Sequence, residues 1–527
     1  MTIEKSPASA TVRGAVAGVL AGGLALGVAQ LIAGLISSAS SPVVAVGELS
    51  IDFTPPAVKN FAIRAFGSHD KVVLVSGILV VLAIFAAAIG VLAVRRLGYG
   101  MAGLGVFVLV GLIAALTRPG ATASDVAPTL IGGIAAALVL RRLARLAAPA
   151  PAPAPAPPAP AYAPPAPPPA PAPQRRSFIT TGAAVAGTAL VAGLGGKLLA
   201  ERGNVTAARR TLRIPPPATP APPLPGGADL KIPGLSSFIT PNSTFYRVDT
   251  AIVLPEITPA SWQLRIHGMV AREITLSFDD LIKRPLFEDY ITLTCVSNPV
   301  GGPYIGNARW LGASLSSLLR QAGVRSGAEQ LLCTSSDGFT SGSPVQVAMD
   351  GRDSMLAVAM NGSVLPVEHG FPVRMVVPGL YGYVSACKWI TDIEVTTYAA
   401  SRAYWAGRGW DQQAPIKTES RIDVPAGGGT LRAGPHPVAG VAWAQHKGID
   451  AVEVRVDKGS WHPARLATVP GIDTWRQWAW DWDATPGSHL IESRATDRTG
   501  YTQTALQVPP EPNGASGYPQ VVVKVSA

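Results

Sequence analysis

Charged residues and cysteines are both scarce in this chain. Only 14% of its 527 residues are charged and 48% are hydrophobic, which is typical of a protein with a membrane portion. The formal net charge of +10 does not indicate nucleic-acid binding, because many basic residues stand beside apolar segments, where they act as topology signals. Three cysteines, Cys295, Cys333 and Cys387, are too few for a disulfide framework, so cysteine usage carries no argument about export.

Haem ligands are also missing from the sequence. It contains no Cys-X-X-Cys-His motif for covalent haem attachment. Residues 1–200 contain a single histidine, His69, so their apolar segments cannot offer a histidine pair to one haem. We therefore expect no haem in this chain, and a membrane portion that is an anchor or docking platform. Contact between these segments and a quinone stays open.

Five apolar stretches are each close to the length that crosses a bilayer. They are rich in Ala, Gly, Val and Leu, which suits close packing in lipid, and cover residues 14–36, 72–94, 99–117, 126–143 and 178–199. Arginines follow the second and fourth stretches, at positions 95–96 and 141–145. The positive-inside rule puts these clusters and the N-terminus inside and the 37–71 loop outside. The first four stretches predict a membrane region over 1–146.

A Pro/Ala tract and two arginines precede the fifth stretch. Residues 149–173 are all Pro or Ala except Tyr162, so we expect an extended linker over 147–174. Arg175–Arg176, followed by Ser, Phe, Ile and an apolar run, is typical of a twin-arginine export signal; the alternative is ordinary positive-inside flanking. Since no cleavage site is evident, segment 175–200 is expected to remain as an anchor, with everything after it on the extracytoplasmic side.

The rest of the chain divides into three parts by pattern. Residues 201–234 are Pro-rich and predict a second tether, 235–410 mix helical and strand patterns, and 411–527 show short strands separated by turns. We expect strands at 262–268, 370–378 and 389–397, and helices at 277–280 and 315–322. The resulting fold class is an N-terminal α-helical membrane domain, an α+β domain, and a C-terminal all-β sandwich of immunoglobulin-like type.

Cys295 stands at the most informative position in the α+β region. It ends an apolar, β-branched run and is followed by the Gly-rich turn Val-Ser-Asn-Pro-Val-Gly-Gly. A thiolate at the end of a buried strand can bind a soft metal, and the backbone N–H groups of such a turn can hold an anion. By contrast, Cys333 in Leu-Leu-Cys-Thr is predicted to be a small buried core residue.

Further motifs follow Cys295 in a fixed order. They are Asn307-Ala-Arg-Trp310, His369-Gly-Phe-Pro-Val-Arg374 and Tyr383-Val-Ser-Ala-Cys-Lys-Trp389. This ordered set resembles the sulfite oxidase family of molybdopterin enzymes, over roughly residues 235 to 500. The resemblance implies a sulfite oxidase-type α+β fold that binds molybdenum-molybdopterin, and a C-terminal domain often used for dimerisation, so a homodimer is an expectation. It also implies that Cys295 is the metal ligand.

The resemblance further implies which residues contact the pterin. Molybdopterin carries a phosphate and many hydrogen-bonding edges, so fixed cations and amides suit it. The expected cofactor-binding residues are Asn242, Tyr246, Arg247, Cys295, Ser335, Asp337, His369, Arg374, Ser385 and Lys388. A structural role is the alternative for each: an arginine can extend from a strand to solvent, and a histidine can cap a turn.

The substrate is less well defined than the cofactor. The family's sulfite oxidases and nitrate reductases carry an arginine shortly after the metal-binding cysteine, but Pro299 and Val300 stand there in this chain. Arg309 is our candidate catalytic replacement; a structural salt bridge is its alternative. We therefore expect oxo transfer on a small sulfur oxyanion such as sulfite, with reduction of an S-oxide or N-oxide as the runner-up.

A third reading is a cofactor-free binding or envelope protein. The joint presence of Cys295, His369, Arg374 and Lys388 disfavours it. As an enzyme, the chain is expected to work with a small-molecule substrate and a separate electron-transfer partner, a cytochrome or a quinone-linked protein. It is expected in the cell membrane, with its catalytic domain on the extracytoplasmic side.

Overall fold

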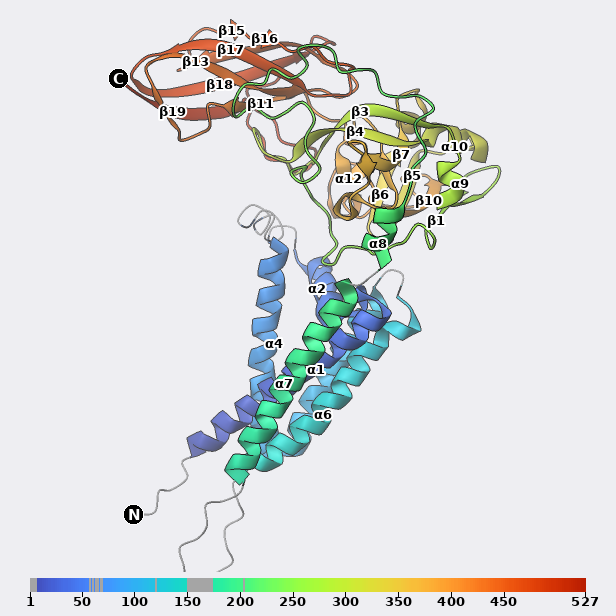
Figure 1. The fold of residues 1–527 in the computed structure, drawn as a ribbon, viewed down its shortest axis with the longest axis vertical. Coiled ribbons are helices and arrows are strands. Elements are labelled where there is room, and N and C mark those ends of the chain that lie inside the picture. Colours follow the sequence, from blue (N-terminus) through green and yellow to red (C-terminus); the bar gives the residue numbers. More distant parts are fainter. Residues whose placement is uncertain are drawn as a thin grey trace, which may run out of the picture. The chain divides into compact units, whose positions relative to one another are not determined.

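The chain forms two compact units, shown as ribbons in Figure 1. The computed structural model describes residues 7–55, 58, 61, 66, 70–118, 121–148, 174–201 and 204–527. The first unit covers Met1–Gly203 together with Ala251–Val253, and the second covers Asn204–Thr250 and Leu254–Ala527. Two predicted features, the Pro/Ala tract at 149–173 and the loop residue His69, lie outside the described residues.

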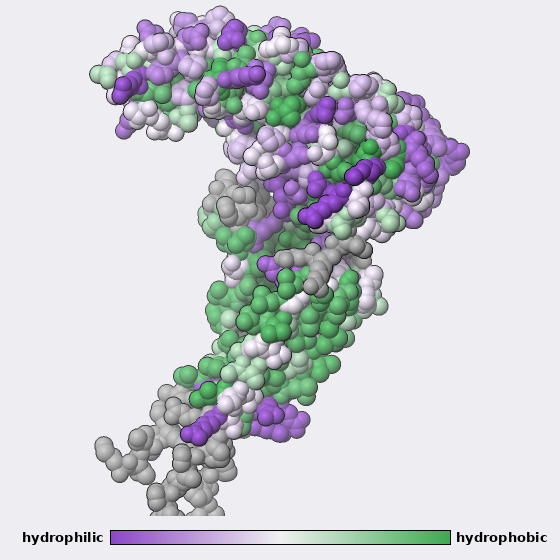
Figure 2. All heavy atoms as spheres, viewed as in Figure 1, coloured by the Kyte–Doolittle hydropathy of each residue, from purple (hydrophilic) through white to green (hydrophobic). Residues whose placement is uncertain are grey.

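The first unit is a set of long apolar helices. They are α1 (Pro7–Ile36), α4 (Asp70–Arg95), α5 (Leu97–Thr117), α6 (Ala127–Ala147) and α7 (Gln174–Glu201). In the described part of the chain, five helical spans are long and apolar enough to cross a membrane: Ala10–Ile36, Lys71–Arg95, Leu97–Thr117, Ala123–Ala147 and Arg176–Leu199. Figure 2 shows apolar side chains over their surface. The five predicted stretches are confirmed as apolar helices, to within a few residues.

One further helix was not predicted from the sequence. Helix α2 (Pro42–Phe53) lies in the segment expected to be a loop. It begins with Pro42 at the first helical turn, where a missing N–H costs nothing. At 12 residues it is too short for the length criterion that identified the other helices.

Helix α1 makes close backbone contacts on two sides. A Cβ on Gly18 would collide with the backbone of α4 at Ala86, and one on Gly14 would lie 3.1 Å from Gly90 O. A Cβ on Gly27 or Gly34 would collide with the backbone of α7 at Ala189 or Gly196. Small residues let helix backbones approach closely where lipid gives no hydrophobic driving force. The glycines of α1 therefore make it the helix on which α4 and α7 pack.

The segment predicted as a Pro-rich tether is largely attached to the second unit. It begins with helix α8 (Asn204–Thr211), whose Arg209 guanidinium donates to the carbonyls of Val364 and Leu365 at 2.9 Å each. Farther on, Ala218 N–H donates to Leu286 O at 2.7 Å. Prolines prevent a regular strand here, but the remaining backbone groups still find partners.

One mixed sheet and one antiparallel sheet build the α+β part of the second unit. The first has the order β2-β1-β10-β5-β6, with β1 (Gln263–Gly268), β2 (Ile274–Ser277), β5 (Gln330–Ser335), β6 (Thr340–Pro344) and β10 (Ile390–Thr396). The second has the order β3-β4-β7-β8, with β9 paired to β7: β3 (Leu286–Thr294), β4 (Ile305–Ser314), β7 (Met355–Met360), β8 (Ser363–Val364) and β9 (Arg374–Val376). The strands expected at 262–268 and 389–397 are therefore confirmed.

Short helices connect these strands. They are α9 (Phe278–Ile282), α10 (Leu315–Ala322), α11 (Val345–Met349) and α12 (Gly382–Ser385). Ser277 caps α9, accepting a hydrogen bond from Asp280 N at 3.2 Å, and Ser314 caps α10. Both predicted helices are confirmed, because each is defined by local cap and periodicity signals.

The strand predicted at 370–378 is shorter than expected. Regular pairing begins only at Arg374, because Gly370 ends a 3-10 turn with φ of 109° and Pro372 has no N–H to donate to a neighbour. The apolar residues between them are buried as predicted, but as irregular backbone. Burial alone does not separate a strand from a packed loop.

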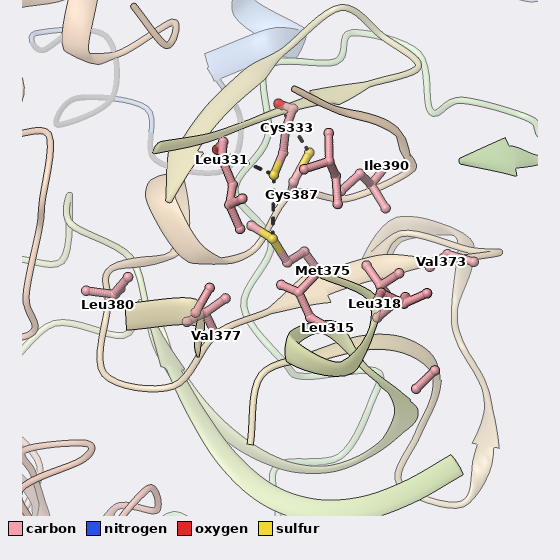
Figure 3. Close-up of a cluster of buried hydrophobic side chains, with 14 of the residues drawn as sticks. Leu315, Leu318, Leu331, Cys333, Val373, Met375, Val377, Leu380, Cys387 and Ile390 are labelled. Atoms are coloured by element: carbon pink, nitrogen blue, oxygen red, sulfur yellow. Dashed lines mark hydrogen bonds between the residues drawn. The ribbon is translucent and has the colours of Figure 1, made fainter. Parts of the chain in front are cut away.

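The core between the two sheets contains a group of sulfur atoms (Figure 3). Cys333 Sγ lies 3.6 Å from Met375 Sδ, and Cys387 Sγ lies 4.0 Å from the carbonyl oxygen of Cys333. Leu315, Leu318 and Ile390 pack around them. Cys333 is a buried core residue, as predicted.

The C-terminal part consists of two antiparallel-rich sheets. One has the order β11-β13-β17-β16 and the other β12-β19-β18-β14-β15. Their bounds are β11 (Glu419–Val424), β12 (Thr430–Arg432), β13 (Gly434–Trp443), β14 (Ile449–Val456), β15 (His462–Pro463), β16 (Arg465–Leu466), β17 (Arg476–Ala484), β18 (Gly487–Asp497) and β19 (Gln520–Ser526). Residues from both sheets share one apolar core, including Val438, Trp478 and Ile491. The predicted β-rich C-terminal part is confirmed, and its immunoglobulin-like type stays a prediction.

Candidate active site

Cys295 follows β3 directly and begins a closed turn. Its N–H donates to Tyr304 O at 2.9 Å, which continues the β3–β4 pairing by one step. Asn298 fixes the turn from inside: its N–H donates to Cys295 O at 3.1 Å, and its side-chain oxygen accepts from Tyr304 N at 2.8 Å. A Cβ on Gly302 would lie 2.6 Å from that side-chain oxygen, so only glycine fits there.

The Cys295 thiol is buried, and its surroundings influence its pKa in opposite directions. Burial raises its pKa, while hydrogen bonds from Ser297 and the positive charge of Lys388 act in the opposite direction. Without a metal the side chain is therefore a thiol near neutral pH. A soft metal would have to displace its proton, as thiolate ligation requires.

Asn242 connects several parts of the site. Its side-chain oxygen accepts from Asn361 Nδ2 at 2.7 Å, and its carbonyl lies 3.1 Å from His369 Nε2. Since a carbonyl can only accept, Nε2 carries the proton and Nδ1 of the neutral ring is an acceptor. Burial lowers the pKa of His369 to about 4, so the imidazole is neutral at physiological pH.

Aromatic side chains surround this histidine. The Phe245 ring contacts the His369 ring edge-on, with centroids 5.5 Å apart, and stacks on Tyr246 at 5.3 Å. Desolvation raises the pKa of Tyr246, which keeps its hydroxyl protonated. A Cβ on Gly382, at the start of α12, would lie 3.6 Å from this hydroxyl and 3.6 Å from Thr294 O, so α12 begins beside the Cys295 turn.

Arg374 is a buried cation with unused hydrogen-bonding capacity. Its Nη1 donates to His369 O at 3.1 Å and its Nη2 to Ala386 O at 3.3 Å, and its guanidinium lies over the Trp310 ring at 5.0 Å. Burial lowers its pKa to about 10, which still leaves it charged at neutral pH. Its buried Nε has no partner among the described residues.

Lys388 is the second buried cation of the site. Its Nζ pairs with Asp249 at 2.7 Å and donates to Glu368 O at 3.2 Å. Asp249 also pairs with Arg247, at 2.8 Å. Burial lowers the pKa of Lys388 to about 8, although Asp249 opposes this shift. The structure thus joins two expected cofactor-binding segments, around Arg247 and around Lys388, through one carboxylate.

Three of the expected contacts are arranged differently. Ser385 Oγ donates to Leu380 O at 2.9 Å inside the α12 turn, so its hydroxyl is occupied by backbone. Asp337 accepts from Phe339 N at 3.1 Å and shapes a turn. Ser335 Oγ is buried and has no partner among the described residues. Ser335 thus retains a buried polar group that a ligand would satisfy.

Arg309 is not brought to the Cys295 turn. It pairs with Tyr290 across the β3–β4 ladder, which at ~3.3 Å per residue is roughly 16 Å along the strand from Cys295. Its guanidinium lies 3.6 Å from Glu288, and its backbone N–H donates to Asn361 Oδ1 at 2.9 Å. The structural salt bridge, our alternative for this residue, fits its position better than a catalytic role.

Sequence reasoning missed Asp249 and Trp310 as parts of the site. Asp249 ends the same segment as Arg247, yet nothing local shows that it faces Lys388 across the fold. Trp310 lies in a quoted motif, but its contact with Arg374 depends on how β4 and β9 are brought together by β7. Both contacts are long-range, so spacing along the chain carried no signal.

The side chains present fit a molybdopterin. The partnerless, buried Arg374 Nε and Ser335 Oγ are polar groups that a bound ligand would satisfy. Two buried cations, Arg374 and Lys388, suit a phosphate, and a single thiol at Cys295 suits a metal whose other ligands come with the cofactor.

Comparison with known proteins finds similarity in the part of the chain that contains these residues. Residues 251–405 match the family model described as the oxidoreductase molybdopterin binding domain. The chain is 31% identical over 291 residues to the mitochondrial sulfite oxidase of Rattus norvegicus, covering 47% of this chain and 52% of that protein. It is 32% identical over 298 residues to the sulfite oxidase of Gallus gallus, covering 47% of this chain and 63% of that protein.

These matches show a sulfite oxidase-like molybdopterin-binding oxidoreductase domain within the chain. The chain spans little more than half the length of the curated relatives it matches. Among solved structures, the sulfane dehydrogenase SoxCD from Paracoccus pantotrophus matches with a TM-score of 0.47 and 24% identity, covering 55% of this chain and 84% of that chain.

Proposed function

We propose that this protein is a membrane-anchored molybdopterin oxidoreductase that transfers oxygen to a small sulfur oxyanion such as sulfite. For sulfite the balanced reaction joins one water to the substrate, giving sulfate, two protons and two electrons. The observation that carries the proposal is the convergence of the Cys295 thiol with two buried cations, Arg374 and Lys388, and the neutral His369.

Each group has a role that follows from its chemistry. Molybdopterin, when bound, supplies the two-electron oxo-transfer chemistry. Cys295 holds the metal from the end of β3, and its rigid turn fixes the thiolate in place. Arg374 and Lys388 hold anionic groups of the cofactor, and the neutral His369 offers Nδ1 as an acceptor.

The electron acceptor is proposed to be a separate protein, a cytochrome or a quinone-linked carrier. Oxidation of sulfite releases electrons in pairs, and they must leave before the next turnover. We also propose an extracytoplasmic site for the second unit and pairing of two copies through the C-terminal sheets. The candidate membrane spans and their flanking arginines support the anchoring and orientation.

A reductase of S-oxides or N-oxides is the second candidate. Pro299 and Val300 follow the metal-binding cysteine, and Arg309 lies with Glu288 instead of near the turn. A dianion would therefore lack one fixed positive partner that the oxidases have, whereas a neutral S-oxide would not need it. This observation favours the runner-up over other reactions of the same cofactor.

The test begins with the full chain, expressed in a molybdopterin-competent host and purified in detergent. We expect near-stoichiometric molybdenum and a fluorescent pterin oxidation product. Cys295→Ser should reduce molybdenum content or turnover at least about tenfold, because a hydroxyl is a poor soft-metal ligand. Cys333→Ala, in the core, is the matched control and should keep its metal.

Reaction direction is decided by paired assays on the same preparation. Sulfite oxidation is followed with ferricyanide, and reduction of methionine sulfoxide or trimethylamine N-oxide with reduced methyl viologen. Turnover with sulfite supports the first candidate, and turnover with the oxides alone supports the second. Folded wild-type protein with neither metal nor pterin would refute both and leave a cofactor-free binding protein.

A further inference from the structure

Asp249 joins two segments that are distant in the chain. Its carboxylate, nearly inaccessible to solvent, accepts from Lys388 Nζ at 2.7 Å, and from Arg247 at 2.8 Å through Nε and 3.3 Å through Nη2. Lys388 belongs to the segment after α12, and Arg247 to the extended segment before β1. The carboxylate therefore lies between the two cations.

Lys388 needs an anion to stay charged where it lies. Its side chain is 10% exposed, and Arg374 and Arg247 both act against its positive charge. The Lys388 charge also adds to the lowering of the His369 pKa, and it partly opposes the rise that burial causes in the pKa of Cys295 and of Cys387. Besides Asp249, Lys388 has the Glu368 carbonyl at 3.2 Å and the Trp389 ring at 4.6 Å as partners.

An ammonium has three N–H donors, and two of them are used at Lys388. One points to Asp249 and one to Glu368 O, and among the described residues the third makes no further hydrogen bond, with only the Trp389 ring 4.6 Å from the ammonium. With two donors held by fixed acceptors, the direction of the third is set by geometry. A lysine held in this way presents one donor to a ligand instead of sampling many rotamers.

We propose that Asp249 is a positioning residue that holds Lys388 as a fixed cation facing the phosphate end of the molybdopterin. The inference rests on the proposed function for its ligand, a pterin phosphomonoester. Asp249 does not touch the reacting atoms; it acts through Lys388, and secondarily by orienting Arg247.

The test compares variants of the full-length protein, loaded with cofactor and purified in detergent. Samples are dialysed at pH values from 6 to 9, and the retained pterin is measured by its fluorescent oxidation product and molybdenum by mass spectrometry. For Asp249→Asn, we expect the pH of half-retention to fall by about 1 to 2 units, because an opposite charge at this range shifts a pKa by that much. In Asp249→Glu, which keeps the negative charge, the pH of half-retention should stay close to the wild-type value.

Two further variants separate positioning from a merely structural role. An arginine side chain does not titrate between pH 6 and 9. The double variant Lys388→Arg, Asp249→Asn should therefore show no pH-dependent loss of pterin in this range. Asp423→Asn is the matched control: Asp423 is also buried and pairs with Arg421 at 2.6 Å, on β11. It should leave the half-retention pH unchanged.

A cofactor-independent readout keeps this inference distinguishable from the proposed function. Competitive acetylation of the apo protein, followed by mass spectrometry, gives the titration midpoint of Lys388 directly, and Asp249→Asn should lower it. A wild type without pterin refutes the proposed function. A wild type that holds pterin, with Asp249→Asn altering neither the Lys388 midpoint nor the half-retention pH, overturns the positioning role alone. Loss of pterin by Asp249→Asn equally at every pH also overturns it.

Discussion

His369 and Arg374 are two basic side chains buried side by side, and only one of them carries charge. The Arg374 guanidinium donates to the His369 carbonyl at 3.1 Å, and its charge disfavours protonation of the imidazole. Burial acts in the same direction and is the larger cause. At neutral pH the Arg374 guanidinium is therefore charged and the His369 ring is neutral. The ligand meets one positive group and one hydrogen-bond acceptor.

The lowered pKa of His369 predicts acid sensitivity of the apo protein. The folded pKa of His369, about 4, lies below the usual 6.5, so the unfolded chain binds the proton at a higher pH than the folded chain does. Protonation therefore favours unfolding, and the free energy of unfolding decreases as pH falls from 6.5 toward 4. Between pH 7 and 4.5 the loss should be roughly 2 kcal/mol, absent in His369→Gln. Denaturant unfolding at both pH values, in detergent, measures it.

Tryptophan fluorescence makes this measurement specific. All eleven tryptophans lie from Trp262 onward, in the second unit. Other carboxyls titrate in the same window, so the informative quantity is the difference between wild type and His369→Gln. An equal acid-induced loss in both proteins would contradict a neutral, buried His369.

Individual residues also mark the limit of what the sequence could predict. The strand and turn around Cys295 were predictable because they are contiguous, so their order along the chain is their order in space. The surroundings of Arg309 and Asp249 were not predictable, because the position of each depends on partners elsewhere in the fold. Arg309 faces Glu288 across a strand pair, and Asp249 meets a lysine 139 positions away.

At the scale of elements, β3 is held in place by the C-terminal part of the chain. Thr292 Oγ1 accepts from Trp475 N at 2.7 Å and donates to Asn307 Oδ1 at 3.0 Å. Gln445 Nε2 donates to Thr292 O and to Thr294 Oγ1, both at 3.1 Å. The strand that leads to Cys295 is therefore fixed from the side opposite its β4 partner.

Thr292→Val should destabilise the second unit by about 1–3 kcal/mol. The substitution preserves shape but leaves the Trp475 N–H and the Asn307 oxygen buried and unpaired. Thr275→Val, on the exposed side of β2, is the matched control and should change stability by less than about 0.5 kcal/mol. The tryptophan signal reports both; equal unfolding midpoints would exclude a supporting role for Thr292.

Elements with strong local signals were predictable, and those without were not. Apolar length identified the five long helices, the cap at Ser277 identified α9, and helical apolar spacing identified α10. Helix α2 was missed because 12 residues give too weak a signal beside the long spans. The strand at 370–378 was predicted too long, because apolar residues in a packed loop show the same sequence pattern as a buried strand.

At the scale of the whole molecule, the twin arginines in the first turn of α7 bear on the location of the second unit. Export of an already folded domain would let the cofactor be inserted in the cytoplasm, before the site crosses the membrane. Twin-arginine export requires the two arginine side chains themselves, whereas positive-inside flanking requires only positive charge.

A double substitution separates the two explanations. Arg175→Lys with Arg176→Lys keeps the charge, so ordinary orientation signals persist while twin-arginine recognition is lost. We expect the second unit to be digested by external protease in wild-type spheroplasts and protected in the double variant. Arg141→Lys with Arg142→Lys is the control and should behave as wild type; digestion in all three would exclude twin-arginine export.

The glycine contacts of α1 with α7 carry a consequence for the order of biogenesis. In the proposed membrane-anchored protein, the backbone contacts at Gly27 and Gly34 form once both helices are in the bilayer, and α7 is synthesised last of the five. Until α7 arrives, lipid tails would occupy its place beside these glycines. The final step of assembly is then a lateral docking event, in which a helix displaces lipid from a groove of small residues without moving any bulky side chain on α1 at these two positions.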